Sequence, residues 1–410
     1  MEKPFSVAAR TANNPRSGIR EIFTLANEKA AQGETVYRLM IGVPDTKTPD
    51  TVIEGTIAAL HEQKTQYTAN AGISELREAI AKQVNNAHQL SVQADQVIVV
   101  PGAMAGLLFA NFTIEAGKQI LIPTPGYPNY KMQAGLTGLN TVHYRLAIEN
   151  GFQPDLDELA RLVESGGKDV GAILINTPGN PTGTVFNKDT IIGISRIAKK
   201  YGVPIISDEV YKDILLDDTL EHISPAQFAP DHTLLVGALS KKYSMTGMRI
   251  GFLIVPKHAI CDTELLGEAT ISCAPSICQW GGLAGLEGDQ AQVDGYDVQY
   301  RQRRDAIVSI LAEAGLKFTR PSGAFYMMVD IGDAGLSSRD FALQLLKEKG
   351  VGVAFGSDFG PTDAKHPLYA ACDRLVRIAF CSGSMDTLRI GTEKLCEFYI
   401  EKSTASGSTH

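Results

Sequence analysis

The middle of the chain, from about residue 95 to residue 255, carries short apolar runs separated by stretches with helical periodicity. The runs are rich in β-branched residues and nearly continuous, whereas a strand with one solvent-facing side would alternate apolar and polar residues. Continuous apolar strands are typical of a mostly parallel sheet that helices cover on both faces. The pattern predicts an α/β domain with a seven-stranded sheet, with strands at Gln96–Val100, Gln119–Pro123, Thr141–Tyr144, Val170–Ile175, Val203–Ile206, Thr233–Val236 and Ile250–Val255.

The pattern changes on both sides of this region, where helical periodicity dominates and strands are few. The expected elements there are helices at residues 17–32, 50–62, 73–88, 293–314 and 338–349, and strands at residues 38–45 and 324–329. We therefore expect a large domain at residues 49–292. A smaller α+β domain is expected to combine the N-terminal segment 1–48 with residues 293–398, and residues 399–410 are expected to form a flexible tail.

The composition is that of a globular protein. The chain has 410 residues, of which 44% are hydrophobic, and its formal net charge is −8. No basic stripe is present, so a nucleic-acid partner is not expected. We find no apolar signal segment and no run long enough to span a bilayer, so we expect a cytoplasmic protein without membrane contact. Six cysteines without a CxxC pair and eight scattered histidines indicate free thiols and no metal site.

Polar side chains follow five of the predicted strands. Ligands of parallel α/β sheets collect at the carboxyl ends of the strands, so these five segments are expected to surround one site. Each segment by itself has an ordinary structural interpretation, as a turn, a surface carboxylate or a core aromatic. Together they offer a helix N-terminus, an aromatic ring, an amide, a carboxylate with a phenol, and a lysine with an arginine. The five segments are Pro101–Met104, Pro123–Tyr127, Asn176–Gly183, Ser207–Tyr211 and Gly237–Gly251.

The last of these segments carries two adjacent lysines, Lys241 and Lys242, and an arginine, Arg249. A lysine on a loop that leaves a buried strand can form a Schiff base with a carbonyl group. An arginine nearby can hold a phosphate with its planar guanidinium. A solvated basic loop would explain this segment taken alone, but the other four strand ends favour a site for a cofactor with both a carbonyl group and a phosphate.

Nine short motifs, in their order along the chain, resemble the pyridoxal-phosphate-dependent enzymes of fold type I. Within these, the chain resembles the class I/II aminotransferases, to which aspartate aminotransferase belongs, from about residue 35 to residue 395. The resemblance implies a pyridoxal 5′-phosphate cofactor, a homodimer with shared active sites, and transfer of the amino group of an L-amino acid to a 2-oxo acid. The motifs are IGVPDTKTP, YTANAGISELREAI, PTPGYPNY, NTPGNPTG, SDEVY, SKKYSMTGMRIGF, PSGAFY, VAFGSDFG and VRIAF.

The resemblance implies a role for each residue around the cofactor ring. Lys241 would bind the cofactor as a Schiff base and move the substrate proton, which a lysine with the ordinary pKa of about 10.4 would do poorly. Asp208 would pair with the pyridine nitrogen and keep it protonated, so that the ring withdraws electrons. Tyr211 and Asn180 would hydrogen-bond the ring oxygen, and Tyr127 would stack on the ring face.

The same resemblance implies a phosphate site at a helix N-terminus. Its members would be Gly102, Ala103, Met104, Ser240, Arg249 and, from the neighbouring subunit, Tyr67. Many relatives carry a phosphate-binding serine three residues before the lysine, where this chain has Ala238. Ser240 would partly substitute for it, and the missing hydrogen bond to a charged acceptor would weaken the site by about 1.5–3 kcal/mol.

For the substrate, the resemblance implies that Arg377 binds the α-carboxylate with both terminal nitrogens of its guanidinium. Asn180 would also contact the substrate, and the backbone around Gly42 would close over it from the small domain. The sequence identifies no second arginine dedicated to a side-chain carboxylate, so it leaves the particular amino acid and 2-oxo acid open.

Two other functions share parts of this pattern. Lyases, cyclases and oxidases of fold type I, including arginine-modifying enzymes, need the same lysine, aspartate and arginine because they also begin by removing the Cα proton. An effector-binding domain of a transcription regulator is expected to follow a DNA-binding module, for which the acidic chain has no room ahead of residue 35. The motifs favour the aminotransferase over both.

Overall fold

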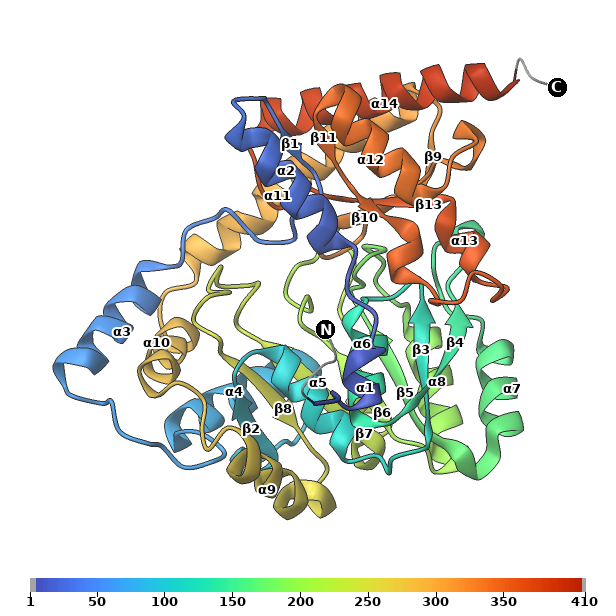
Figure 1. Cartoon of the computed structure of the whole chain (residues 1–410). Coiled ribbons are helices and arrows are strands. Elements are labelled where there is room, and N and C mark those ends of the chain that lie inside the picture. Colours follow the sequence, from blue (N-terminus) through green and yellow to red (C-terminus); the bar gives the residue numbers. More distant parts are fainter. Residues whose placement is uncertain (1–4, 408–410) are drawn as a thin grey trace.

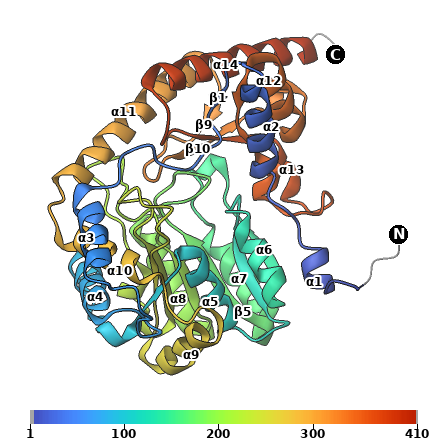
Figure 2. The same ribbon diagram turned by 60° about the vertical axis from the view of Figure 1, so that its left-hand side comes forward.

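The structure is a computed structural model that describes residues 5–407, and it places a small domain above a large one (Figure 1, Figure 2). The large domain is built on a seven-stranded sheet with the order β2-β8-β7-β6-β5-β3-β4. Strand β8 runs antiparallel to both of its neighbours, and the other neighbouring pairs are parallel. The predicted sheet is confirmed, with strands β2 (Val97–Val100), β3 (Gln119–Thr124), β4 (Asn140–Arg145), β5 (Val170–Asn176), β6 (Ile205–Asp208), β7 (Thr233–Ala238) and β8 (Gly251–Ile254).

Strand β5 shows why these strands are apolar along their whole length. Ile173 and Ile175 belong to one hydrophobic core cluster, whereas Ala172 and Leu174 belong to another. Successive side chains of a strand point to opposite faces of the sheet, so both faces must be covered. The helices of the large domain are α3 (Asp50–His61), α4 (Ser74–His88), α5 (Ala103–Phe112), α6 (Asn129–Thr137), α7 (Leu156–Gly166), α8 (Lys188–Tyr201), α9 (Ile260–Thr270) and α10 (Ser276–Glu287).

The small domain contains a four-stranded antiparallel sheet with the order β12-β13-β10-β9. The N-terminal segment joins it as expected, because Tyr37 of β1 pairs in parallel with Val351 of β11. The strands are β1 (Tyr37–Arg38), β9 (Lys317–Phe318), β10 (Tyr326–Asp330), β11 (Val351–Gly352), β12 (Ala354–Phe355) and β13 (Leu375–Ala379). The helices are α2 (Ile19–Ala31), α11 (Ala291–Glu313), α12 (Ser338–Lys349), α13 (Tyr369–Asp373) and α14 (Met385–Gly407), with the short α1 (Ala9–Ala12) ahead of them. The domain boundaries at residues 48 and 292 stay predictions.

The strand expected at Arg38–Asp45 is wrong for most of its length, because β1 ends at Arg38. Leu39 and Met40 are fully buried, which explains why the segment is apolar although its backbone does not pair as a strand beyond Arg38. The segment continues as a loop, and Arg303 fixes its far end by donating two hydrogen bonds to the Asp45 carboxylate, at 2.9 and 3.0 Å. Irregular backbone is thereby held between the two domains.

The flexible tail expected at residues 399–410 is also wrong as far as Gly407, where α14 ends. The small polar residues of this stretch stay within the helix, where the Ser403 hydroxyl donates to the carbonyl oxygen of Tyr399 one turn earlier. Phe398, one residue before the expected boundary, is fully buried and packs on Phe341 of α12, with ring centroids 5.0 Å apart. Residues 408–410 lie outside the described part of the chain.

Within residues 5–407, none of the helices combines the length and the apolar character that crossing a membrane requires.

Candidate active site

A cavity of about 400 Å³ lies between the two domains, at the carboxyl ends of the parallel strands. Its large-domain wall comes from the segments that follow β2, β3, β5, β6 and β7. Its small-domain wall comes from β10, β13, α2 and the loop after β1. Of the residues expected at the site, the lining includes Gly42, Ala103, Met104, Tyr127, Asn180, Asp208, Tyr211, Ser240, Lys241, Arg249 and Arg377.

Lys241 follows β7 and extends its amino group into the cavity. Its Nζ atom donates a hydrogen bond of 2.8 Å to the carbonyl oxygen of Gly42. Burial lowers the pKa of Lys241 to about 8, and the positive charges of Arg377 and Arg249 act in the same direction. A substantial fraction of the amine is therefore neutral near physiological pH and available as a nucleophile or a base.

The adjacent lysine points elsewhere. Lys242 is absent from the cavity lining, and its amino group lies 3.7 Å from the Asp213 carboxylate, which also accepts a hydrogen bond of 2.9 Å from Lys212. Its ammonium group is thus held by a carboxylate outside the cavity. The structure brings Lys241, and not Lys242, to the predicted site.

Asp208 ends β6, and its side chain is almost fully buried. Burial raises the pKa of this carboxyl to about 6, although hydrogen bonds from the Tyr130 hydroxyl and from the backbone N–H of Val210 oppose the shift. The Tyr130 hydroxyl is 2.7 Å from Oδ2. The sequence analysis did not single out Tyr130, yet it lies one helical turn after Tyr127 in PTPGYPNY, and the two rings contact edge to face at 5.6 Å.

The other end of the cavity is suited to an anion. The first residues of α5, Ala103 and Met104, line it, and the free backbone N–H groups of a helix N-terminus attract negative charge. Arg249 lies against this terminus and donates to the carbonyl oxygen of Pro101 at 3.2 Å. Gly102 adopts a φ of +77°, and a Cβ atom added there would be 2.7 Å from Arg249 Cζ, so glycine allows the arginine to approach.

Arg377 of β13 is 2% exposed and reaches the cavity from the small domain. Its Nη1 donates to Asn180 Oδ1 at 2.9 Å, and its Nη2 donates to the carbonyl oxygen of Met40 at 2.7 Å. Its Nε makes no hydrogen bond. A buried guanidinium with an unused donor and no carboxylate bound to it suits a ligand that brings its own carboxylate.

Tyr211 follows β6, and its hydroxyl lies 3.0 Å from the hydroxyl of Tyr326 on β10. Burial raises the pKa of both phenols, so both remain protonated. Tyr326 was not among the predicted site residues, although PSGAFY ends in it. The centroid of its ring also lies 4.5 Å from Cζ of the Arg377 guanidinium, at the distance of a cation–π contact.

Two residues of α2, Arg20 and Phe23, also line the cavity and were not predicted individually. Both side chains are exposed. Within the described residues, we find neither a hydrogen bond nor an ion pair for the Arg20 guanidinium. An arginine in an exposed helix gives no sequence signal of its own, and only the packing of α2 against the small domain brings it here.

Gly102 directly precedes the lining residue Ala103 but does not itself line the cavity. Tyr67 is the predicted residue that lies away from it. It is 88% exposed and lines a separate groove, together with Thr68 and Trp280. The prediction assigned it to the active site of a neighbouring subunit, which a single chain does not test.

The residues of the cavity fit pyridoxal 5′-phosphate: an amine with a lowered pKa, a buried carboxylate across from it, and a helix N-terminus with an arginine. This combination defines a pyridoxal-phosphate-dependent enzyme of fold type I. The model of the family "Aminotransferase class I and II" matches residues 34–395, and the chain belongs to that family.

Similar proteins support the same assignment. An aspartate aminotransferase of Pyrococcus horikoshii is 34% identical over 88% of this chain and 91% of its own length. An arginine–pyruvate transaminase of Pseudomonas aeruginosa is 31% identical over 89% of this chain and 94% of its own length. Among solved structures, an aspartate aminotransferase of Thermus thermophilus with maleate superposes with a TM-score of 0.88 at 30% identity, covering 96% of this chain and 100% of that one.

The protein is thus a pyridoxal-phosphate-dependent aminotransferase, which transfers the amino group of an amino acid to a 2-oxo acid. Nothing in the comparisons favours the lyase, cyclase or oxidase alternatives. The roles of individual residues follow from the geometry as proposals.

Proposed function

We propose that Lys241 holds pyridoxal 5′-phosphate and moves the Cα proton of the substrate during amino transfer. The observation that carries this assignment is the convergence of Lys241, Asp208 and Arg377 on one cavity from both domains. When bound, the cofactor withdraws electrons from Cα. An amine whose pKa is about 8 can then accept the proton near neutral pH, as an ordinary lysine cannot.

Asp208 is proposed to face the pyridine nitrogen of the cofactor. Its raised pKa, about 6, reflects burial, which outweighs the two hydrogen bonds it accepts and the positive charge of Lys241. A protonated ring nitrogen would supply a further positive charge and favour the ionised carboxylate. Tyr130 would act as a positioning residue, because its hydroxyl fixes one carboxylate oxygen and leaves the group aimed into the cavity.

The remaining cofactor contacts are proposed along the large-domain wall. The phosphate would lie at the N-terminus of α5, where Arg249 neutralises it and Ser240 donates a hydrogen bond. Tyr127 would stack on the ring, while Tyr211 and Asn180 would donate to the ring oxygen. The proposed phosphate site comprises Gly102, Ala103, Met104, Ser240, Arg249 and the neighbouring subunit's copy of Tyr67.

For the substrate, Arg377 would bind the α-carboxylate, and Arg20 would bind a second carboxylate on the side chain. The support is the unpaired Arg20 guanidinium on the same cavity, with Phe23 beside it. A guanidinium repels a cationic side chain, so an arginine-like substrate is disfavoured and an acidic one is favoured. The names of several relatives, which are aspartate aminotransferases, agree with an acidic substrate.

The test is to mix the holoenzyme with each L-amino acid in turn and to follow the cofactor spectrum and the 2-oxo acid released. We expect conversion to the amino form of the cofactor, fastest with aspartate or glutamate. Release of ammonia without that conversion would contradict the assigned roles. Arg20→Gln should lower kcat/KM for the acidic substrates about 10- to 100-fold, as expected for one charge-assisted hydrogen bond, and leave alanine unaffected.

Arg16→Gln is the matched control, because Arg16 is an exposed arginine just before α2 that does not line the cavity. If Arg20→Gln and Arg16→Gln behave alike with aspartate, the side-chain subsite is wrong while amino transfer stands.

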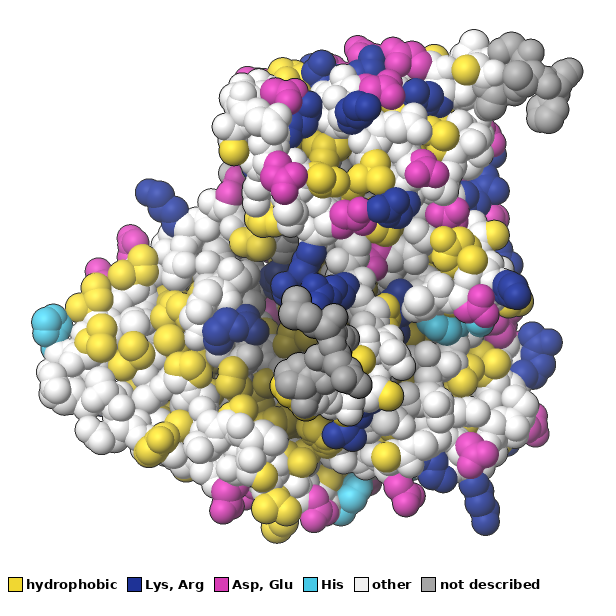
Figure 3. All heavy atoms as spheres, in the orientation of Figure 1, with side chains coloured by type: hydrophobic (Ala, Val, Ile, Leu, Met, Phe, Trp, Pro, Cys, Tyr) yellow, Lys and Arg dark blue, Asp and Glu magenta, His cyan; other side chains and the backbone are white. Residues whose placement is uncertain are grey.

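We also propose that two chains form a dimer with shared sites. Hydrophobic side chains gather over α3 (Figure 3, yellow), where Ile53, Ile57 and Leu60 are 43%, 48% and 45% exposed at a helical spacing. Such a stripe on a large chain is typical of an interface. Tyr67 follows α3 on the same part of the chain and would reach the phosphate of the partner, as the family resemblance implies.

A cytoplasmic location is proposed from the thiols. All six cysteines are free, and three of them, Cys372, Cys381 and Cys396, are buried. Proteins of oxidising compartments tend to use cysteines in disulfides. Fractionation of cells that produce the protein would show it in the soluble cytoplasmic fraction.

A further inference from the structure

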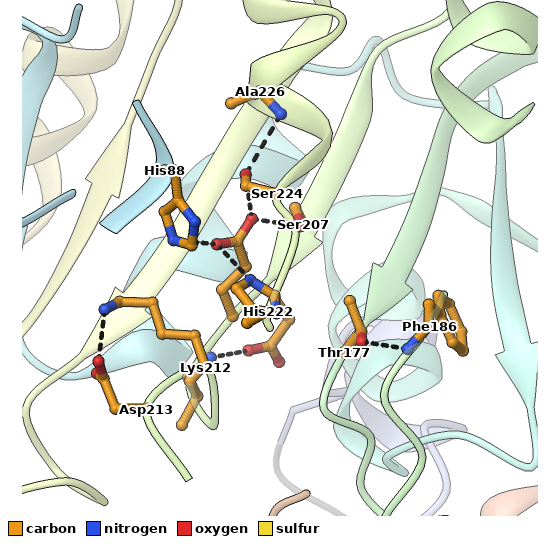
Figure 4. A network of polar contacts seen from close by, with 12 residues as sticks. His88, Thr177, Phe186, Ser207, Lys212, Asp213, His222, Ser224 and Ala226 are labelled. Atoms are coloured by element: carbon orange, nitrogen blue, oxygen red, sulfur yellow. Dashed lines mark hydrogen bonds and ion pairs between the residues drawn. The ribbon is translucent and has the colours of Figure 1, made fainter. Parts of the chain in front are cut away.

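Three buried residues far apart in the sequence meet in the large domain, and Figure 4 shows two of them, His88 and His222, near Ser207 and Ser224. The three are His88, the last residue of α4, Glu209, the first residue after β6, and His222, in the segment before Pro225. Their exposed fractions are 3%, 1% and 7%. Because they come from three separate segments, no spacing in the sequence reveals them.

The Glu209 carboxylate is fixed in place by its neighbours. Its Oε1 accepts hydrogen bonds from the hydroxyls of Ser207, at 2.9 Å, and Ser224, at 2.6 Å. Its Oε2 lies 2.9 Å from His222 Nε2 and 3.8 Å from His88 Nε2. One oxygen is therefore committed to two serines, and the other faces two imidazoles.

The protein around His88 leaves the polar atoms of its imidazole ring without hydrogen-bond partners among the described residues. Among residues 5–407, neither of its nitrogens has a hydrogen-bond partner, and Nδ1 of His222 has none either. Leaving a buried polar group unsatisfied costs about 1–3 kcal/mol. A neutral imidazole has one ring nitrogen with an unshared electron pair, which can accept a hydrogen bond or bind a metal ion.

We propose that His88 Nε2, Glu209 Oε2 and His222 Nε2 form a binding site for a divalent transition-metal ion, with Zn²⁺ as the best-fitting ion. The candidate ligand atoms lie within 4.8 Å of one another. Tetrahedral Zn²⁺ with bonds of about 2.0–2.1 Å separates its ligand atoms by about 3.3 Å. The two separations from Oε2, 2.9 and 3.8 Å, bracket that value, and an ion would draw the two histidine nitrogens, which lie within 4.8 Å of each other, closer together.

The ligand set selects this class of ion. Two imidazoles with one carboxylate suit Zn²⁺, Co²⁺ or Ni²⁺, whereas Mg²⁺ and Ca²⁺ prefer oxygen ligands throughout. The two serine hydroxyls on Oε1 would orient the carboxylate as outer partners of metal ligands do. The nearest lysine, Lys212, has its charge paired with Asp213 at 2.9 Å.

The bound ion would tie α4 to the segment that follows β6. Glu209 is the next residue after Asp208, so the negative charge of Glu209 lies close to the active-site carboxylate. A cation on Glu209 would offset that charge without touching substrate or cofactor. The site is therefore structural, with an electrostatic effect on the active-site carboxylate.

The experiment uses the holoenzyme, stripped of metal with a chelator, dialysed against Zn²⁺ and analysed for metal by mass spectrometry. We expect about one Zn²⁺ per chain and a thermal unfolding midpoint that rises with Zn²⁺ concentration. His88→Phe should lose both effects, because the new ring has no ligand atom. His143→Phe removes another partly buried histidine, from β4, and serves as the control that should keep both.

His88→Phe is also informative without metal. Since neither nitrogen of His88 is hydrogen-bonded, the metal-free variant should be at least as stable as the metal-free wild type. Equal zinc content in the wild type and in His88→Phe would overturn the proposal, and so would a wild type that binds none.

Co²⁺ gives a second measurement that does not depend on the folding of a variant. The wild-type holoenzyme with Co²⁺ should show the visible absorption bands of a four-coordinate ion between about 500 and 650 nm, the range in which a tetrahedral site absorbs. Their absence at saturating Co²⁺ would also overturn the proposal.

Discussion

At the scale of single residues, the two adjacent lysines differ in the direction of their side chains, and only one of them reaches the cavity. Lys241 donates to the carbonyl oxygen of Gly42 across the domain boundary, whereas Lys242 lies 3.7 Å from Asp213 outside the cavity. Lys241 lies near two arginines, which help to lower its pKa, whereas Lys242 is near a carboxylate that stabilises its charge.

The first prediction follows from this difference. Lys241→Ala should lower turnover by at least about 10²–10⁴-fold, the contribution of a positioned general base, and should abolish the covalent attachment of cofactor after borohydride reduction. Lys242→Ala is the control and should retain both. Peptide mapping locates the attachment, and an adduct on Lys242 would contradict the assignment.

The second prediction concerns the pKa of Lys241. Burial disfavours the charged amine, so the pKa is lowered to about 8 and the neutral form is present at a lower pH than for an ordinary lysine. In the cofactor-free protein, the acylation rate of Lys241 should be half-maximal near pH 8, and that of exposed lysines near pH 10.4. Competitive labelling followed by mass spectrometry measures both in one sample, and identical profiles would refute the shift.

At the scale of elements, the proposed phosphate site depends on how closely β8 approaches the N-terminus of α5. Gly251, the first residue of β8, leaves no room for a side chain: an added Cβ atom would lie 2.5 Å from the carbonyl carbon of Gly102 and 2.6 Å from the backbone nitrogen of Ala103. Both contacts are to backbone atoms, so only a movement of α5 or β8 could relieve them.

The third prediction is that Gly251→Ala displaces the α5 N-terminus from the anion site. We expect a loss of about 1–3 kcal/mol in the free energy of unfolding, the usual range for overpacking, and at least tenfold weaker cofactor binding. Gly247→Ala is the matched control, because nothing lies within 4 Å of the Cβ it would add. Thermal unfolding measures the stability of both variants, and titration with cofactor measures their affinity. Unchanged cofactor affinity in Gly251→Ala would contradict the prediction.

At the scale of the whole molecule, the cavity has walls from two domains, and Tyr67, a predicted member of the site, lies away from it. Tyr67 is 88% exposed, beside an α3 face whose apolar residues are also exposed. Both features are explained together if a second chain covers α3 and receives Tyr67, since isologous dimers bury the same face of each chain.

The fourth prediction tests this arrangement with hybrid dimers. Tyr67→Phe should weaken cofactor binding about 10-fold, by loss of one hydrogen bond to a charged group, and Lys241→Ala should be inactive. When the two variants are mixed and reassembled, one site of each hybrid contains neither substitution. Activity at limiting cofactor should then rise above that of either variant alone.

If Tyr67 served its own chain instead, each site of the hybrid would carry one substitution, and no site of wild-type affinity would form. A chain that sediments as a monomer with full activity would also refute the shared site.

The sequence by itself determined the sheet and most of the site. Runs such as Val170–Ile175 are apolar at every position, and their shortness and β-branched residues favour a strand covered on both faces over a buried helix, so the seven strands could be placed within a few residues. The site residues Asp208 and Lys241 follow such strands directly, and the carboxyl ends of parallel strands meet at one edge for purely topological reasons.

Tertiary structure alone decided the features that depend on side-chain direction or on contacts between distant segments. Leu39 and Met40 have the apolar side chains expected of a buried strand, but they lie in a loop. A side chain can be buried without its backbone pairing in a sheet. Arg20 and Tyr130 reach the cavity only through the packing of their helices. His88, Glu209 and His222 meet only because three segments close on one another, since the ligand atoms of a site must be near in space but need not be near in the chain.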